Sequence, residues 1–165
     1  MDVELSPVAE QHKSVLANLL QFHLHDLSEH RGGGPSPHAT FDYPYLDHYF
    51  TEEAREAFFI ASAGRLAGFA LTRLLDDRVR HVAEFFILRG RRRHGLGRAA
   101  AHLLFRRRPG TWELAFDHAN RPAARFWPGA VDAVAAGPVT VVERYPPETA
   151  VPGTLLRFDV PAPQT

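Results

Sequence analysis

Cysteine is absent from the 165-residue sequence, and several other residue types are scarce. Without cysteine the protein cannot form disulfides, use a catalytic thiolate or bind a metal ion through thiolate sulfur. Lys13 is the single lysine, so nearly all fixed positive charge is carried by arginine. Long apolar runs are missing too, and no stretch approaches the roughly 20 residues that a membrane-spanning helix needs. The composition therefore predicts neither a disulfide-stabilised protein nor a membrane protein.

Net charge is also absent, because 19 basic residues balance 19 acidic ones. A neutral chain has no overall attraction to nucleic acid or to a membrane surface, so neither is an expected partner. A chain of this length is expected to form a single domain, residues 1–165, with its own hydrophobic core. The first ten residues lack a basic region followed by an apolar stretch, so we expect no signal peptide and a cytoplasmic protein.

The N-terminal third begins with a strand signal and continues with helix signals. Residues 2–5 alternate between polar and apolar, and Ser6-Pro7 is typical of an N-cap followed by proline at the first helical position. Glycine and proline at 32–37 predict a loop, and 43–50 predicts a short second helix. The first helix is expected to bury one apolar face, made of Val8, Val15, Leu16, Leu19 and Leu20.

The later segments predict mainly strands, so the chain is expected to adopt an α+β fold, an α/β mixed sheet flanked by helices. Residues 57–63, 66–75 and 80–88 are separated by short turns and predict a meander of three strands. Further strands are expected at 111–116, 139–144 and 154–160, with a helix at 120–127 that Pro128-Gly129 ends.

The most informative stretch is Ala83–Phe105. An apolar run, Phe85–Leu88, stops at the basic segment Arg89–Arg93, and Gly95 and Gly97 then open a segment with helical spacing. Its apolar residues fall at helical steps and predict one buried stripe, made of Leu96, Ala99, Ala100, Leu103 and Leu104.

A strand, a basic glycine turn and a helix start together predict an anion-binding site. The first amides of a helix have no intrahelical acceptor, and the helix dipole adds partial positive charge at that end. Gly95 and Gly97 have no Cβ atom, so a bulky anion can approach the backbone. Arg92, Arg93 and Arg98 supply full positive charges around it.

Residues 92–97, Arg-Arg-His-Gly-Leu-Gly, fit the pattern Arg/Gln-x-x-Gly-x-Gly/Ala, and this segment resembles the pyrophosphate loop of the GNAT superfamily of N-acetyltransferases. The stretch after Asn120 resembles the second region through which that family contacts acyl-CoA. The resemblance covers about residues 58–127. It implies a mostly antiparallel central sheet that splays where the acyl arm binds, acetyl-CoA as cosubstrate and no metal.

By resemblance, two groups of residues contact acetyl-CoA. The end of the third meander strand would pair its main chain with the pantetheine arm and polarise the thioester carbonyl, and the glycine loop would hold the pyrophosphate. The residues implied are Phe86, Ile87, Leu88, Arg92, Arg93, His94, Gly95, Leu96, Gly97, Arg98, Asn120, Ala123, Ala124 and Phe126.

Two residues on the third meander strand are candidates for the general base. Glu84 is a carboxylate embedded in an apolar strand, and His81 stands nearer the position where some family members place a base. The two numbers differ in parity, so a regular strand directs them to opposite faces, and a β-bulge would change this. The family's acid is often a tyrosine after the asparagine; here Trp127 occupies that position, and an indole cannot supply the proton.

By resemblance, residues 22–49 form one wall of the acceptor site. Its candidates for binding a small-molecule amine are Asp26, Glu29, Asp42 and Tyr43. His23, His25, Asp26 and His30 also suggest a metal site, but their spacing does not place them on one helical face. Polar surface is therefore the preferred interpretation of these histidines.

The leading hypothesis is an acyl-CoA-dependent N-acyltransferase that moves acetyl to a small-molecule amine by direct attack in a ternary complex. The alternative is a non-catalytic domain that binds or senses acyl-CoA, which Trp127 favours. A nucleic-acid-binding module using Arg91–Arg93 and Arg106–Arg108 fits less well, because the chain is neutral and these runs contain no aromatic residues. The apolar late strands either complete the monomer or form a homodimer interface, and both remain open.

Overall fold

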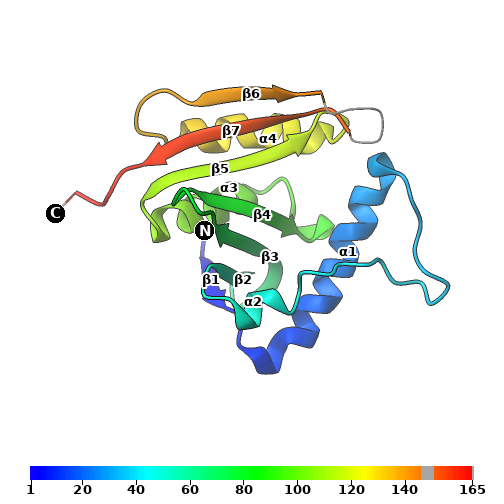
Figure 1. The fold of residues 1–165 in the computed structure, drawn as a ribbon. Helices are drawn as coiled ribbons and strands as arrows, with labels where there is room; N and C mark the ends of the chain where they lie inside the picture. The colour runs from blue at the N-terminus through cyan, green and yellow to red at the C-terminus, as the bar shows by residue number, and fades with distance from the viewer. Residues whose placement is uncertain (146–150, 165) are drawn as a thin grey trace.

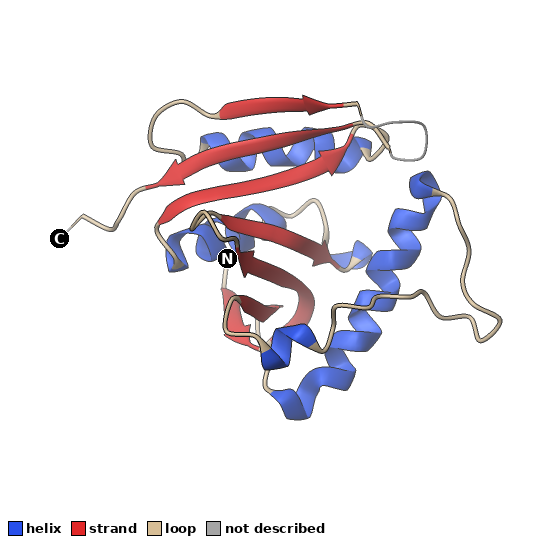
Figure 2. Cartoon of the chain, in the orientation of Figure 1, coloured by secondary structure: helices blue, strands red, loops and turns tan. Residues whose placement is uncertain are grey.

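The computed structural model describes residues 1–145 and 151–164, which form one seven-stranded sheet with helices on both faces (Figure 1). The strands follow the order β1-β2-β3-β4-β5-β7-β6 across the sheet. Their bounds are β1 Val3–Pro7, β2 Arg55–Ser62, β3 Arg65–Leu74, β4 Arg80–Ile87, β5 Gly110–Asp117, β6 Thr140–Arg144 and β7 Gly153–Val160. The expected mixed sheet flanked by helices is confirmed (Figure 2).

Neighbouring strands in the described sheet run antiparallel except for β4 and β5. The parallel ladder between these two has two pairs, Arg80 with Trp112 and His81 with Glu113. Both strands then continue without further pairing to each other, and Figure 1 shows them diverging. The sheet is therefore mostly antiparallel and splays between two central strands, as the resemblance implied.

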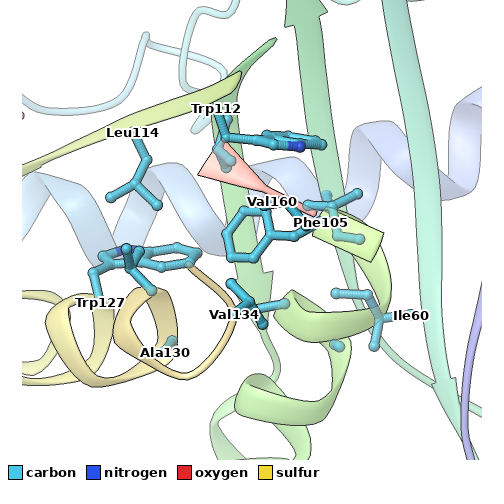
Figure 3. Close-up of a cluster of buried hydrophobic side chains, with 14 of the residues drawn as sticks. Ile60, Phe105, Trp112, Leu114, Trp127, Ala130, Val134 and Val160 are labelled. Carbon is cyan, nitrogen blue, oxygen red and sulfur yellow. The ribbon is translucent and has the colours of Figure 1, made fainter. Parts of the chain in front are cut away.

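The α-helices of the described chain are divided between the two faces of the sheet (Figure 1). Their bounds are α1 Lys13–Arg31, α2 His48–Thr51, α3 Leu96–Arg107 and α4 Arg121–Asp132, with 3-10 turns at Glu10–His12 and Arg89–Arg91. α1 and α2 bury Leu16, Leu20 and Tyr49 against one face. α3 and α4 cover the other face, where Phe105 and Trp127 lie in a larger core (Figure 3).

The first helix does not begin where the local signal predicted. Ser6 and Pro7 belong to β1, where they pair with Phe59 and Phe58 of β2, and α1 starts only at Lys13. Ladder hydrogen bonds to β2 replace the capping geometry that Ser6-Pro7 would have adopted alone. Proline is tolerated there because β1 is an edge strand, whose outer amides have no partner to lose.

The predicted stop at Pro128-Gly129 is also wrong, because α4 continues through Pro128 to Asp132. Proline inside a helix removes one hydrogen bond and ordinarily bends or ends it. Here Ala130 and Val131 are fully buried in the core just beyond it. The burial of these side chains stabilises the last turn, a non-local contribution that a local breaker rule does not include.

Two residues placed on predicted apolar faces are exposed instead. Val15 is 37% exposed on α1, and Leu103 is 42% exposed on α3. On α3 the buried stripe runs through Ala101 and Phe105, which are fully buried, in addition to Leu96, Ala100 and Leu104 as expected. The buried stripe of α3 is therefore shifted around the helix toward Ala101 and Phe105 relative to the predicted one.

A β-bulge in β4 decides which side chains share a face. Leu71 of β3 pairs with Glu84, but the next residue of β3, Thr72, pairs with Val82. Ala83 is the extra residue, so the alternation of side chains slips by one. His81 and Glu84, whose numbers differ in parity, therefore lie on the same face of the sheet, the face covered by α1 and α2.

Candidate active site

The open edge of β4 lies where β4 and β5 part. Beyond the pair of His81 with Glu113, no described residue of β5 pairs with β4. On its other edge β4 is held closely by β3, since a Cβ atom on Gly68 would lie 1.9 Å from the carbonyl oxygen of Phe86. Main-chain groups of β4 that point away from β3 are therefore free to pair with an extended ligand, as an added strand would.

The loop between β4 and α3 passes twice through left-handed backbone conformations. Arg93 has a φ of 67°, and Gly95, the N-cap of α3, has a φ of 77°. A left-handed arginine costs about 1 kcal/mol or more, and such strain is concentrated in functional loops. The N-cap glycine provides no side chain to satisfy the first amides of α3. The loop therefore has the geometry of an anion site at a helix N-terminus.

Asp26 of α1 pairs with the arginines at the base of this loop. Its carboxylate accepts hydrogen bonds from Arg89 at 2.8 and 3.0 Å and from Arg92 at 2.6 Å. Arg92 also donates to the carbonyl oxygen of Ile87 at 2.7 Å. Burial by itself would raise the pKa of Asp26, but the two arginines outweigh burial and the pKa is lowered. Asp26, a predicted amine-binding residue, is thus already neutralised within the protein.

α4 completes the surroundings of the α3 N-terminus. The side-chain oxygen of Asn120 accepts a hydrogen bond from the main-chain amide three residues later and caps α4. Gly97 lies against Phe126, since a Cβ on Gly97 would be 3.4 Å from that ring. Arg98 donates to the carbonyl oxygen of Gly129 at 3.2 Å. Of the other residues predicted to contact acetyl-CoA, Phe86, Ile87 and Leu96 are buried, Leu88, Ala123 and Ala124 half-buried, and Arg93 and His94 exposed.

Glu84 is paired with a histidine that the sequence did not connect to it. The carboxylate oxygen Oε2 of Glu84 lies 2.6 Å from Nε2 of His23, on α1. Both side chains are largely buried, with 17% and 10% exposure, and the rings of Phe69 and Phe86 lie beside the imidazole. The two residues are 61 positions apart in the chain. A short, shielded carboxylate–imidazole pair of this kind can accept and hold a proton.

A second missed group, Tyr49 and Arg55, lies near the predicted substrate residue Tyr43. Burial raises the pKa of the Tyr43 hydroxyl far above its usual range, and the charge of Glu84 adds to the rise. Burial also raises the pKa of Tyr49, although Tyr43 and Arg55 partly oppose it. Both hydroxyls are therefore protonated donors at neutral pH. No local sequence signal joins residues from α2, β2 and β4.

His81, the second candidate base, has its own partner on β5. Its Nδ1 lies 3.2 Å from Glu113, which also accepts a hydrogen bond from Arg157 at 3.1 Å. Burial lowers the pKa of His81 and nearby Arg73 adds to the effect, while the charge of Glu113 raises it less strongly. His81 is therefore neutral at pH 7, next to the point where β4 and β5 part.

We expect this lowered pKa to make the protein less stable in mild acid. An unfolded chain binds a proton at His81 near pH 6.5, whereas the folded chain binds it only at lower pH. The contribution of neutral His81 to the free energy of unfolding is therefore fully present above pH 6.5. It decreases as the pH falls below 6.5. Urea unfolding of wild type and His81→Gln between pH 7.5 and 5.5 should show a weaker decline in the variant.

His38→Gln is the matched control, because His38 lies exposed on a loop away from the sheet. Its stability should follow pH as in the wild type. Equal slopes for wild type and His81→Gln would contradict the prediction.

The remaining predicted substrate and metal residues are dispersed. Glu29 and Asp42 are exposed. His23 faces Glu84, while His30 lies 3.3 Å from Asp117 of β5, so these histidines point to different partners. Within residues 1–145 and 151–164, no group of three or more histidine, aspartate or glutamate side chains could hold a metal ion.

Residues 21–128, more than half of the chain, match a family model described as the acetyltransferase (GNAT) family. The chain belongs to the GNAT acetyltransferase family. The resemblance inferred from the glycine loop is confirmed. No curated protein matches the chain in sequence. None of the helices in the described part of the chain is long and apolar enough to cross a membrane.

Several solved GNAT-fold structures are similar over nearly their whole length. An acetyltransferase from Thermus thermophilus is 16% identical with a TM-score of 0.67, covering 97% of this chain and 98% of that one. Spermidine N-acetyltransferase from Vibrio cholerae, in complex with CoA and spermine, is 11% identical with a TM-score of 0.64 and 96% coverage of both chains. The ribosomal-protein-S18-alanine N-acetyltransferase from Escherichia coli is 16% identical with a TM-score of 0.57, covering 98% and 96%. At these identities the similarity shows the fold.

GNAT enzymes take their acyl group from acetyl-CoA, and the α3 N-terminus of this family member fits such a donor. Its first-turn amides, left-handed loop residues and exposed arginines suit a pyrophosphate, and the open edge of β4 suits an extended amide-containing arm. Trp127 is buried against Phe85, Phe105 and Phe126 and serves the core.

Proposed function

We propose that this GNAT protein transfers the acetyl group of acetyl-CoA to the amine of a small molecule, by direct attack in a ternary complex. The observation that carries this proposal is the shielded pair of Glu84 and His23 beside the parted strands β4 and β5. In this proposal Glu84 is the proton acceptor beside the open strand edge, and the N-terminus of α3 holds the anionic part of the donor. Acyl transfer to an amine needs both features.

Binding of the donor is assigned to the loop and the strand edge. The amides of the first turn of α3, with Arg93 and Arg98, would hold the pyrophosphate, and the main chain of Phe86–Leu88 would bind the pantetheine arm. Bound acetyl-CoA supplies a thioester acyl group that is already activated. The protein's own contribution is to orient that group and to donate main-chain hydrogen bonds to its carbonyl oxygen.

Removal of the acceptor's proton is assigned to Glu84. An amine is protonated at neutral pH and cannot attack until it loses a proton, which Glu84 can accept while His23 stabilises the carboxylate's position. Tyr43, protonated and next to Glu84, can orient the amine. Trp127 has no acidic group, so the proton for the leaving sulfur is assigned to solvent, which suffices for a thiol of pKa near 8.5.

The structural neighbours support amine acetylation without naming the acceptor. One acts on spermidine and another on the alanine of a ribosomal protein, so the same fold serves very different amines. The acceptor must therefore be argued from this chain's own side chains.

Calorimetric titration with acetyl-CoA, followed by thiol-release assays with a panel of amines, tests the proposal. We expect saturable binding in the micromolar range and acetyl-CoA-dependent thiol release with at least one amine. Binding without any amine-dependent release would favour the second candidate, a domain that only senses acyl-CoA, which the missing tyrosine at Trp127 supports. Absence of binding by folded protein would contradict both.

A further inference from the structure

Cross-strand pairing places a row of polar side chains across the sheet, on the face of α1 and α2. Arg55 of β2 pairs with Arg73 of β3, which pairs with His81 of β4. His81 pairs with Glu113 of β5, which pairs with Arg157 of β7. The row crosses β4 at His81, a short distance along that strand from Glu84. It contains more positive than negative charge. Among the described residues of the row, His81, Glu113 and Arg157 satisfy one another by hydrogen bonds.

Two like charges stand directly opposite each other in this row, at Arg55 and Arg73. Like charges at opposed positions of a sheet are destabilising. Arg55 is partly offset by Glu52, whose carboxylate accepts a hydrogen bond from its Nε at 2.8 Å. Among residues 1–145 and 151–164, no carboxylate forms an ion pair with Arg73. The protein therefore keeps an uncompensated cation in a position where fold stability alone would not favour one.

A surface hollow of about 560 Å³ opens at this arginine pair. Its lining includes both arginines, with Glu52, Asp76 and Asp77. The three carboxylates are solvent-exposed, and Asp77 is within 3.6 Å of Arg157, whereas Arg55 and Arg73 are half-buried. Two of the three carboxylates already have an arginine partner, Glu52 with Arg55 at 2.8 Å and Asp77 with Arg157 at 3.6 Å, whereas Arg73 forms no ion pair with a described carboxylate.

Tyr49 packs beside Arg55 of the pair. The residue is 6% exposed, and its hydroxyl lies near Tyr43 and Arg55 but makes no hydrogen bond of good geometry with any described residue. The guanidinium carbon of Arg55 lies 5.3 Å from the centre of its ring. The two arginines provide the donors that a carboxylate requires.

The hollow lies within one small molecule's length of the proposed base. Arg73 is on the strand next to Glu84 and about two residues away along it, which places their Cα atoms about 8 Å apart. Their side chains leave the same face of the sheet. A molecule that contacts both would carry its amine at Glu84 and an anion a few atoms away.

We propose that the acceptor is an amine that also carries a carboxylate, an amino acid or a close relative, whose carboxylate binds Arg73 and Arg55. This inference rests on the proposed acetyl transfer and names the substrate class of that same site. Asp26, Glu29 and Asp42, which would have suited a polycation, are paired with arginine or exposed to solvent. The guanidinium pair recognises the carboxylate, and Glu84 accepts the proton of the amine.

The test compares α-amino acids with their carboxamides and with their decarboxylated amines, which keep the amine but lose the negative charge. Thiol release gives kcat/KM, and calorimetry in the presence of CoA gives binding without turnover. In the wild type we expect acids to be preferred over the matched amides by about 10- to 100-fold, the effect of one or two charge-assisted hydrogen bonds. Arg73→Gln should reduce this preference at least tenfold by raising KM for the acids.

Arg65→Gln is the matched control, because Arg65 is an exposed arginine near the other end of β3. It should keep the acid preference. We expect Arg73→Gln to unfold at the same urea concentration as the wild type or at a higher one, because the substitution removes one of two opposed like charges. If Arg73 served only the stability of the fold, its replacement would lower the urea concentration at which the protein unfolds.

The outcomes separate this inference from the proposed function. Turnover of amides and decarboxylated amines as efficiently as acids would overturn the inference and leave acetyl transfer standing. Binding of acids that depends on Arg73, without turnover of any amine, would support a carboxylate site at Arg73 and Arg55 but overturn acetyl transfer and with it the role of the acid as acceptor. If none of the acids binds or reacts, the inference is overturned, whether or not the amines react.

Discussion

Replacing Glu84 with glutamine is expected to lower kcat for amine acetylation by about 10²- to 10⁴-fold, the range that general acid–base catalysis contributes. Glutamine has nearly the same size and can keep a hydrogen bond to His23, but its amide cannot accept a proton. The affinity for acetyl-CoA should match that of the wild type, because Arg92–Arg98 is unchanged. Single-turnover thiol release separates this chemical step from product release.

Glu113→Gln is the matched control for Glu84→Gln. Glu113 is also a strand glutamate bonded to a histidine on the same face, and its loss should change kcat by no more than several-fold. An unaltered kcat in Glu84→Gln would contradict the assigned role and favour His81 or solvent as the base. A large loss in both variants would point to a general disturbance of the sheet, which urea unfolding of each variant would detect.

Replacing Gly95 with aspartate is expected to weaken acetyl-CoA binding by about 100-fold. A unit negative charge about 5 Å from an anionic phosphate costs about 3 kcal/mol at an effective dielectric constant of about 20. The new carboxylate would stand at the N-cap of α3, where the pyrophosphate is proposed to bind. The same carboxylate should stabilise α3 through its interaction with the helix dipole. We therefore expect the added charge to cost the fold little stability.

Gly95→Asn separates the charge from the backbone strain. The φ of 77° at Gly95 disfavours both side chains, but asparagine and aspartate tolerate left-handed geometry similarly and differ mainly in charge. Calorimetric titration should give a Kd for Gly95→Asn much closer to the wild type than to Gly95→Asp. Equal losses of acetyl-CoA affinity in the two variants would assign the effect to backbone strain. Wild-type affinity in both variants would show that the pyrophosphate does not bind at the α3 N-terminus.

Short-range signals were enough to find the candidate anion site and most elements of the fold. Gly95 and Gly97, with Arg92 and Arg93, occupy one turn of chain, and their proposed function depends on the backbone of that turn. Strand and helix periods are likewise expressed over a few consecutive residues. The sequence therefore predicted the mixed sheet and a helix opening at Gly95 and Gly97, where α3 begins at Leu96.

The local rules failed where distant contacts outweighed them. Ser6-Pro7 was predicted to cap a helix, but pairing with β2 drew it into a strand. Pro128 was predicted to end α4, but burial of Ala130 and Val131 carried the helix onward. In each case the energy of a non-local ladder or core exceeded a local preference of about 1–3 kcal/mol.

The candidate catalytic pair was inaccessible to local patterns for the same reason. Glu84 stood out as a carboxylate in an apolar strand, but its partner His23 is 61 residues away and suggested only a metal ligand. Counting along a regular strand put His81 and Glu84 on opposite faces. The sequence gives no clear local signal for the bulge at Ala83 that changes this alternation. The bulge is set by pairing with β3, so only the assembled sheet places both side chains on one face.

The chain's sequence was sufficient for the family and for a proposed donor loop, because the residues of the glycine turn are consecutive. The acceptor side is different, since it is assembled from α1, α2, β2, β3 and β4. The opposed arginines Arg55 and Arg73 look ordinary in the sequence, where they stand in separate strands. They become a candidate carboxylate site only because antiparallel pairing sets them side by side, and that register follows from the packing of the whole sheet.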